Sequence, residues 1–432
     1  MRTIGLDIGT TSISAVVSED GRVIHSVTEQ NNASIKSDFP ENRLQSVDVI
    51  INKVFSVKEK LIKEFAPIDA IGVTGQMHGI LYIDDNANAV SPLYTWQDRS
   101  GELKYKDNTV SDYLAELTGY NSPSGYGIVT DFANRVFGRV PDNSIMFCNI
   151  QDYITMKLAN NKMPVTHISN AAGFGFYSFE TLDFDSIAIE KILCDRKRLP
   201  RVTAEAEIIG TDGGIPVTVA IGDNQASFLG SVSDENSVLV NIGTGSQVSV
   251  LTDKKDGFAE GEIRPFSKTE NLLVGAPLCG GRSYALLKSF FEKTLQCFGV
   301  SADKIYSVMD KMAAEDIDNC LLSVDTRFCG TRNKPDLKGS ISQITEENFS
   351  PQQLTRGFLK GMCGELYSFY LDMEKLTGKR RTKLVGSGNG VRKNTILQYY
   401  LEQTFKMPIS IPANLEEAAF GAAIFAEKAK KV

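Results

Sequence analysis

Two segments of the chain share one pattern of apolar and polar positions. Each has an apolar, β-branched run, a turn of glycine with small hydroxyl residues, and a second apolar run. The segments are TIGLDIGTTSISAVV at 3–17 and VLVNIGTGSQVSVL at 238–251. Two apolar runs joined by a short glycine turn are typical of a strand, a turn and a second strand. We therefore predict a β-hairpin near the start of each half of the chain.

The elements after each hairpin also repeat in order. After a third strand at 22–30, residues 44–65 place apolar side chains three and four positions apart, which predicts a helix ending before Pro67. Residues 68–79 then predict a buried strand that runs into a glycine turn. In the second half, a long helix from Ser350-Pro351 to Gly378 precedes a similar strand and turn at 383–394. This order indicates an α/β fold in both halves.

Two further segments bear on the domain boundary. Residues 217–230 form an apolar strand that breaks at Gly222-Asp223, and residues 414–431 form a helix of small residues with Asn414 as its candidate N-cap. Small side chains let such a helix pack closely against a sheet. Because 432 residues exceed what one core usually supports, we expect two domains, at 1–228 and 229–432.

Composition narrows the class of protein. The net charge of −7 and the absence of a long Lys/Arg cluster argue against a nucleic-acid partner. No apolar run approaches the roughly 20 residues that span a bilayer, so no membrane partner is expected. The seven cysteines are scattered and form no CxxC motif, which favours a reducing compartment. With no signal-like N-terminus, we expect a cytoplasmic protein. The oligomeric state stays open, a homodimer included.

The glycine turns suit phosphate. Glycines let the backbone approach an anion, and backbone N–H groups together with the hydroxyls of Thr10, Thr11, Thr244 and Ser246 can donate to phosphate oxygens. The two turns differ at one matching position, which is Asp7 in the first and Asn241 in the second. One carboxylate is enough to position the hard cation that accompanies a nucleotide triphosphate. Two hairpins could therefore hold one polyphosphate.

The motifs DIGTTS, GQMHG, WQD, GDNQAS, IGTGSQ and GSGNG occur in this order along nearly the whole chain. In this respect the chain resembles the FGGY carbohydrate kinases, a branch of the actin, Hsp70 and hexokinase superfamily. The resemblance implies two ribonuclease-H-like α/β domains with an active-site cleft between them, and ATP with Mg²⁺ as cofactors. TGQMHG and TWQDRSG are most similar to ketose kinases, and WQD to sedoheptulokinases in particular.

The resemblance assigns roles to residues whose chemistry fits them. Asp223 would be the catalytic base and a substrate ligand, and Asp7 would position Mg²⁺ through water. Sugar recognition needs polar groups around hydroxyls and an apolar platform. The candidate sugar ligands are Gln76, Met77, His78, Trp96, Gln97 and Asp98. The candidate nucleotide ligands are Thr10, Thr11, Gly243, Thr244, Gly245, Gly386, Gly388 and Asn389. Asn394 resembles a position near adenine more weakly.

The predicted function is ATP-dependent phosphorylation of a ketose, sedoheptulose to sedoheptulose 7-phosphate. A xylulokinase or another pentulose or polyol kinase is the alternative, because pocket depth decides between sugars and the sequence does not reveal it. Arg99 departs from the pattern, since the ketose kinases tend to have Gly-Arg after the Asp where this chain has Arg-Ser-Gly. Two alternatives from other classes of protein are a non-catalytic sugar sensor and a nucleotide-driven conformational switch.

Overall fold

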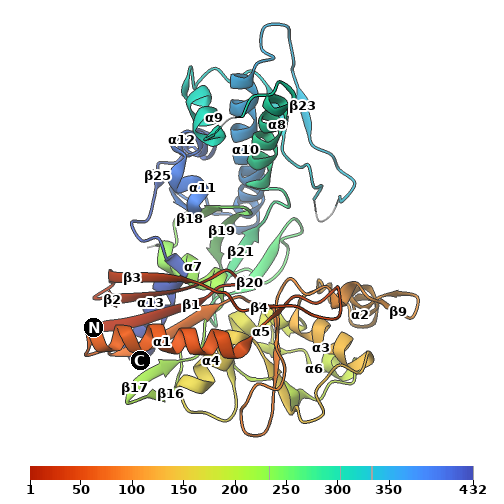
Figure 1. Ribbon diagram of the computed structural model, residues 1–432, viewed down its shortest axis with the longest axis vertical. Helices are drawn as coiled ribbons and strands as arrows, with labels where there is room; N and C mark the ends of the chain where they lie inside the picture. The colour runs from red at the N-terminus through yellow and green to blue at the C-terminus, as the bar shows by residue number, and fades with distance from the viewer. Residues whose placement is uncertain (233, 302, 332–333, 432) are drawn as a thin grey trace. The chain divides into compact units, whose positions relative to one another are not determined.

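Each half of the chain builds a six-stranded mixed sheet around its predicted glycine hairpin (Figure 1). The computed structural model describes residues 1–431 except 233, 302, 332 and 333. The chain divides into two compact units, which are treated separately below. The first unit comprises 1–230, 265–269 and 416–432, and the second comprises 231–264 and 270–415. The expected division at residue 228 differs from these units mainly at the C-terminal helix, which belongs to the first.

The first sheet has the order β16-β17-β6-β1-β2-β3. The hairpin strands β1 and β2 are antiparallel, whereas β6 runs parallel to β1 and β17 parallel to β6. Its strands are β1 (Arg2–Ile8), β2 (Ser12–Glu19), β3 (Arg22–Gln30), β6 (Ala70–Gly75), β16 (Ile208–Asp212) and β17 (Ile215–Thr218). The unit's α-helices are α1 (Val47–Phe65), α2 (Val110–Thr118), α3 (Gly127–Val136), α4 (Ile150–Leu158), α5 (Ile168–Phe174), α6 (Ser186–Lys191), α7 (Asp223–Ser231) and α13 (Glu417–Lys431).

The second sheet repeats this arrangement in the order β20-β21-β19-β18-β24-β25. Here too an antiparallel hairpin, β18 with β19, is flanked by a parallel strand, β24. Its strands are β18 (Ser237–Ile242), β19 (Ser246–Thr252), β20 (Glu262–Pro265), β21 (Asn271–Gly275), β24 (Lys383–Ser387) and β25 (Ile409–Ser410). The α-helices are α8 (Arg282–Cys297), α9 (Ile305–Ala314), α10 (Pro351–Thr377), α11 (Gly388–Lys393) and α12 (Thr395–Phe405). The α/β prediction is confirmed.

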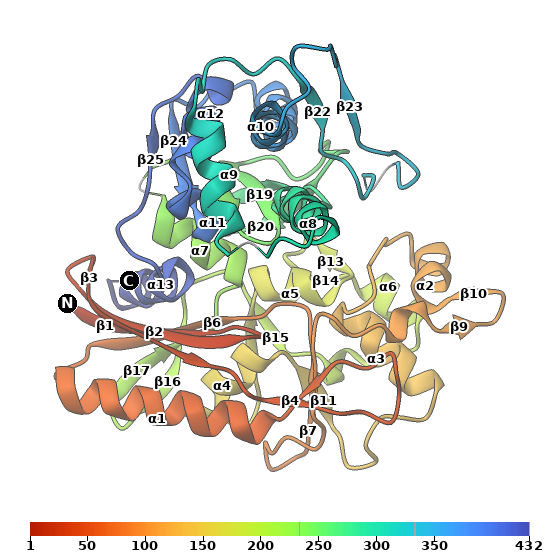
Figure 2. The ribbon, with the colours of Figure 1, turned by 45° about the horizontal axis from the view of Figure 1, so that its top comes forward.

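The first sheet is covered on both faces, by α1 on one side and α13 on the other (Figure 2). On the α13 side, Gly5 of β1 and Gly72 of β6 lie opposite each other in register. A Cβ on Gly5 would lie 1.9 Å from the carbonyl oxygen of Ala419, and one on Gly72 would lie 2.0 Å from that of Ala422. The small residues of α13 therefore pack against glycines of the sheet, which explains why this helix joins the first unit.

The long helix α10 follows the predicted boundaries because both of its ends are capped. Ser350 accepts a hydrogen bond from the backbone N–H of Gln353, Pro351 occupies the first turn, and Gly378 ends the helix with a left-handed φ of 65°. Its apolar face packs against β19 and α12 in the core of the second unit.

Two helix starts differ from the prediction. The helix expected from residue 44 begins at Val47, because Ser46 caps it and Leu44–Gln45 forms a short strand, β5. This strand pairs with β4 (Ser34–Ile35) and β8 (Leu93–Tyr94). The N-cap expected at Asn414 is wrong, since α13 begins only at Glu417. For α1 the apolar spacing begins before the first helical residue, and for α13 the candidate cap lies three residues before the helix starts.

Candidate active site

Three adjacent parallel strands of the first unit place the predicted chemistry at their carboxyl ends. Asp7 is near the end of β1, the Gln76–His78 turn follows β6, and Asp223 follows the segment after β17. The backbone N–H of Gln76 donates to Ile8 O (2.9 Å), and that of Ile221 donates to Val73 O (3.0 Å). Ligands of α/β proteins bind at this edge of the sheet. The sequence predicted each of these residues separately, and the sheet brings them together.

Asp223 is partly buried and begins α7. Its Oδ1 accepts a hydrogen bond of 2.6 Å from the backbone N–H of Asn224. The preceding Gly222 packs against Met77 so closely that a Cβ there would lie 3.0 Å from the Met77 sulfur. The predicted sugar turn therefore lies directly beside the predicted base. The strand was predicted to break at Gly222-Asp223, and in the structure β17 ends at Thr218 and α7 begins at Asp223.

Asp7 stands among other acids. Burial, followed by the charges of Asp223 and Glu416, raises the pKa of the Asp7 carboxyl to about 7. A bound cation would relieve this repulsion, and Mg²⁺ typically uses only one or two protein carboxylates together with water and phosphate oxygens. Among the described residues, no group of three or more His, Cys, Asp or Glu side chains could hold a metal ion by itself. The site thus fits a cation that arrives with phosphate.

The carbonyl groups in the turn of the first hairpin accept hydrogen bonds from neighbouring segments. Gly9 O accepts from the Asn31 side-chain amide (2.8 Å), Thr10 O accepts from Gln45 Nε2 (2.8 Å), and Thr11 O accepts from the Asn31 backbone N–H (2.8 Å). Carbonyl oxygens would repel phosphate, and here three successive ones are engaged by neighbouring elements. The turn is compatible with the predicted phosphate contact.

Thr10 also forms hydrogen bonds through its hydroxyl, which was predicted to donate to phosphate. The hydroxyl donates to Gln76 Oε1 (3.2 Å) and accepts from the indole N–H of Trp96 (3.0 Å). Thr10 thus contacts two predicted sugar ligands. Thr11, in contrast, has an exposed side chain.

His78 is fixed from two sides within the predicted sugar region. Its Nδ1 donates to Gly173 O at 2.9 Å, and its ring stacks on Tyr126 with 4.3 Å between ring centroids. His78 has a φ of 77°, so the turn departs from strand geometry at this residue. Tyr126 comes from the SGYG loop at 124–127 and Gly173 from α5. Both segments lie beside the GQMHG turn.

The WQD segment divides into exposed and buried side chains. Trp96 is 47% exposed and Gln97 is exposed, so both are accessible to a ligand. Asp98 is buried, and its carboxylate accepts backbone N–H groups from Ser100 (2.9 Å) and Arg43 (3.2 Å). Burial raises the pKa of Asp98. These bonds give Asp98 a role in shaping the loop. Arg99 is exposed and forms an ion pair with Glu102 at 2.5 Å.

The second unit contains a cavity of about 660 Å³ at the predicted nucleotide region. Gly243 and Thr244 of the second hairpin turn line it, together with Gly388 and Asn389 of the GSGNG turn. Asn241 joins the two turns, since its side-chain amide donates to the Ser387 hydroxyl (2.8 Å). A Cβ on Gly243 or Gly245 would meet no atom within 4 Å. Protein packing therefore does not require glycine here, whereas the close approach of a ligand would.

Other predicted nucleotide residues behave differently. Gly386 lies in β24, where a Cβ would collide with Val391, Ile409 and Ile411, so its glycine is explained by core packing. The more weakly predicted Asn394 does line the cavity. Its side chain donates to Asp310 Oδ1 (2.7 Å), which also accepts from the Tyr284 hydroxyl (2.8 Å). Burial raises the pKa of Asp310.

Several cavity residues were not found from the sequence, namely Arg282, Tyr284, Tyr306 and Asp310. They come from α8 and α9, which begin 38 or more positions after Thr244 in the chain. Tyr284 and Tyr306 stack with ring centroids 5.8 Å apart. The only sequence signal was Gly280-Gly281 ahead of α8. A Cβ on Gly281 would lie 1.9 Å from Gly243 O, so this loop packs on the hairpin turn.

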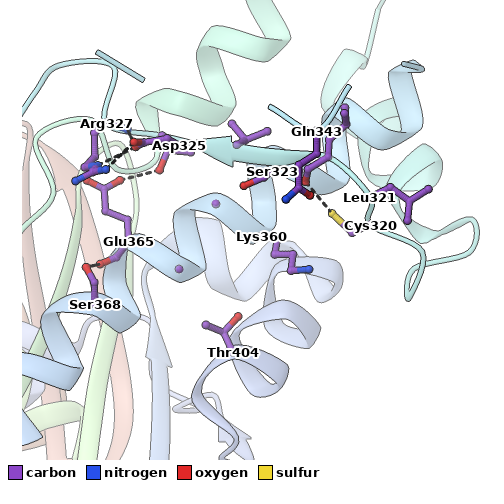
Figure 3. Close-up of a pocket in the computed structure, with 16 residues that line it drawn as sticks. Cys320, Leu321, Ser323, Asp325, Arg327, Gln343, Lys360, Glu365, Ser368 and Thr404 are labelled. Atoms are coloured by element: carbon purple, nitrogen blue, oxygen red, sulfur yellow. Dashed lines mark hydrogen bonds and ion pairs between the residues drawn. The ribbon is translucent and has the colours of Figure 1, made fainter. Parts of the chain in front are cut away.

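A second cavity of the same unit, of about 550 Å³, lies between α10, the strand β22 (Ser323–Asp325) and Thr404 of α12 (Figure 3). No predicted site residue lines it. Several of its polar side chains already have partners. Arg327 pairs with Asp325 (2.6 Å), and the Thr326 hydroxyl donates to Glu365 (2.7 Å). Its wall on α10 includes Gly357, Gly361 and Gly364.

Comparisons with known proteins identify the family of the chain. Residues 2–230 match the N-terminal domain of the FGGY family of carbohydrate kinases, and residues 238–429 match its C-terminal domain. The chain is 26% identical to the sedoheptulokinase of Mus musculus, an alignment that covers 98% of this chain and 96% of that protein. It is 23% identical to the xylulose kinase of Staphylococcus xylosus, with 98% and 90% covered. A ligand-bound xylulose kinase from Lactobacillus acidophilus superposes with a TM-score of 0.80 at 20% identity, over 100% of this chain and 89% of that one.

Proposed function

The chain belongs to the FGGY family of carbohydrate kinases, and from this premise we propose that it phosphorylates a ketose with ATP, namely sedoheptulose to sedoheptulose 7-phosphate. The family makes it a phosphotransferase with an alcohol acceptor. The observation that carries the proposal is the position of Asp223 beside the Met77 turn at the strand ends of the first unit. The full-length similarity to a sedoheptulokinase and the WQD motif support the choice of sugar.

In this proposal the first unit holds the sugar. Trp96 presents an exposed indole to the carbon-bound hydrogens of the sugar, while Gln97 and the Gln76–His78 turn provide polar contacts. Asp223 accepts the proton of the reacting hydroxyl as that oxygen attacks the terminal phosphoryl group. Asp98 stabilises the loop that carries Trp96 and Gln97 by accepting hydrogen bonds from the backbone N–H groups of Ser100 and Arg43.

The nucleotide is assigned to the cavity of the second unit, where Gly388, Asn389 and Asn394 face the adenosine and Gly243 and Thr244 face phosphate. The residues around Asp7 fit a magnesium ion bound through water. Such an ion supplies positive charge that offsets the charge of the transferring phosphoryl group. No helix in the described part of the chain has both the length and the apolar character needed to cross a membrane.

A coupled assay of ADP release with a panel of acceptors tests the proposal. The panel contains sedoheptulose, xylulose, ribulose, fructose, glycerol and gluconate. The highest kcat/KM is expected for sedoheptulose. A higher value for a pentulose or for glycerol would reassign the substrate within the family, and no turnover with any alcohol acceptor would contradict the proposed kinase activity.

Trp96 provides an independent test because it is the only tryptophan in the chain. An indole that stacks on a sugar loses water and changes its emission. Sedoheptulose without nucleotide should shift or quench the fluorescence saturably, and His78→Ala should weaken this response. A ketose that is phosphorylated yet leaves the emission unchanged at saturation would place Trp96 outside the sugar site.

A further inference from the structure

Gln45 is a buried residue of the first unit that belongs to none of the motifs above, yet its side chain joins two of them. Its Nε2 donates to the backbone carbonyl of Thr10 in the hairpin turn (2.8 Å). Its Oε1 accepts from Nε2 of Gln76 in the GQMHG turn (2.8 Å). Gln45 is only 2% exposed, so water does not compete for these bonds.

A third hydrogen bond closes the connection into a ring. The Thr10 hydroxyl donates to Gln76 Oε1 (3.2 Å), so each of the three residues donates to the next and accepts from the previous one. We call this the Thr10–Gln45–Gln76 ring. Both side-chain amides have their orientation determined, because turning either one over would place donor against donor or acceptor against acceptor.

The ring extends to the WQD segment along two routes. The Trp96 indole N–H donates to the Thr10 hydroxyl oxygen (3.0 Å). The backbone of β5, which carries Gln45, pairs with β8, and Thr95 N donates to Arg43 O (2.9 Å). The proposed sugar platform is thus attached to the hairpin turn through the side chain of Thr10 and through the strand of Gln45.

The number of protons available limits what Thr10 can do. A threonine hydroxyl has one proton, and here it is donated to Gln76. While the ring is closed, that proton is not available to phosphate, so the donors that remain in the turn are its backbone N–H groups and the hydroxyl of the exposed Thr11. The position of these N–H groups depends on the carbonyl of Thr10, which Gln45 holds.

We propose that Gln45 is a positioning residue for phosphoryl transfer. It holds the first hairpin turn, at Thr10, in a fixed position relative to the GQMHG turn, at Gln76. It thereby couples ketose binding to the placement of the terminal phosphate. This inference rests on the proposed kinase function and adds to it a residue outside the recognised motifs. Phosphoryl transfer is sensitive to such register, since a displacement of about 1 Å can cost roughly 100-fold in rate.

The decisive variant is Gln45→Met, which retains the length and the unbranched shape of the side chain but removes both hydrogen bonds. Gln353→Met is the matched control. Gln353 is equally a buried glutamine, and it bonds to the backbone at Leu321 and Asn319 in the second unit, away from the proposed site. Gln45→Glu is the second variant, since it keeps the acceptor for Gln76 and loses only the donor to Thr10.

Three readouts separate positioning from general stability. With wild-type enzyme and its preferred ketose as reference, Gln45→Met should lower kcat about 10–100-fold while the KM of the ketose changes far less. The factor by which saturating ketose tightens ATP binding should move towards one. The emission of Trp96 without ligand should also change, because its hydrogen-bond partner Thr10 is released.

The outcomes distinguish this inference from the proposed function. If wild-type enzyme phosphorylates a ketose and Gln45→Met, folded to the same extent, behaves like Gln353→Met, the positioning role is excluded. In a double-mutant cycle, additive effects of Gln45→Met and Gln76→Leu would also exclude it, because partners in one ring must couple. If wild-type enzyme phosphorylates no alcohol, the proposed function fails. An unchanged Trp96 emission in Gln45→Met would then still refute the ring.

Discussion

At the scale of single residues, the structure separates side chains that face ligand from those that hold the site together. Trp96 and Gln97 are exposed, whereas Asp98 of the same motif is buried on two backbone N–H groups. Gly243 and Gly245 have open space where a Cβ would lie, whereas Gly386 is enclosed by apolar side chains. Sequence motifs contain both kinds of residue, because both are needed to build one site.

Asp223 provides the most direct test of the mechanism. Asp223→Asn should lower kcat by about 10²–10⁴-fold, because the amide cannot accept the proton of the sugar hydroxyl. The KM of the ketose should change much less, since the variant has nearly the same shape. Steady-state kinetics with the preferred ketose checks both values. Turnover within about tenfold of wild type would exclude Asp223 as the base.

His167 makes the stability of the first unit depend on pH. Burial lowers the pKa of His167 to about 4, below its usual 6.5, so the folded state holds the ring neutral. Its Nδ1 accepts from the backbone N–H of Ser169, and protonation would remove this acceptor. Because the folded pKa is depressed, the unfolded state binds the proton first, and stability falls as pH drops from about 6.5 towards 4. From pH 7 to pH 5 the loss is roughly 2 kcal/mol.

Urea unfolding followed by Trp96 emission measures this loss, since Trp96 lies in the same unit. The control is His167→Asn, which retains an N-capping side chain and has no imidazole to titrate. Carboxyls such as Asp98, whose pKa is raised by burial, change the stability with pH in the opposite direction. Because both proteins contain these carboxyls, their contribution cancels when the two pH profiles are compared. Parallel pH profiles for the two proteins would contradict the assignment.

At the scale of elements, the α10 helix shows why glycines in one helix are not equivalent. Gly357, Gly361 and Gly364 all face the second cavity. A Cβ on Gly361 would lie 2.3 Å from the backbone carbonyl of Val324 in β22, so glycine is required for this helix and strand to pack. A Cβ on Gly364 would meet nothing within 4 Å. Only the former is explained by packing.

This difference predicts that alanine substitutions at Gly364 and Gly361 have opposite effects on the stability of the second unit. Gly364→Ala should stabilise the second unit by about 0.5–1 kcal/mol, because alanine has the higher helix propensity and no clash arises. Gly361→Ala should destabilise it, since the backbone of β22 would have to move. Thermal unfolding followed by far-UV circular dichroism compares them. If Gly364→Ala also destabilised the unit, the space beside Gly364 would not be open in solution.

At the scale of the whole molecule, the proposed ligands are divided between the units. The sugar candidates belong to the first unit, and the cavity assigned to the nucleotide belongs to the second. The two hairpins have the same topology, each beside a parallel strand, but only the first has a carboxylate at the matching position. A duplicated fold can therefore serve two different ligands.

The division predicts that nucleotide and sugar binding can be altered separately. Gly243→Val should raise the Kd of ATP at least about tenfold, because the new side chain enters space that is open in the cavity. Stability should stay within about 0.5 kcal/mol, since a Cβ at this position meets no protein atom within 4 Å. Calorimetric titration measures ATP binding, and Trp96 fluorescence measures the ketose. Loss of the ketose response with unchanged ATP affinity would reverse the assignment.

The sequence by itself determined the local features of this protein. The hairpins, the capped α10 helix and the order of motifs depend on apolar spacing, glycine turns and capping residues, all of which act between neighbours in the chain. The family also follows from those motifs. The exact helix starts did not follow from it, since Ser46 caps α1 at Val47 and α13 begins three residues after the candidate cap Asn414.

Only the tertiary structure decided which residues meet. The Thr10–Gln45–Gln76 ring joins positions 31 to 66 residues apart, and the cavity of the second unit combines five separate segments. Such contacts depend on strand register and on how closely helices approach a sheet, as with Gly5 and Gly72 under α13. A glutamine such as Gln45 has no local pattern that reveals its partners. Its role comes from the folded backbone that surrounds it.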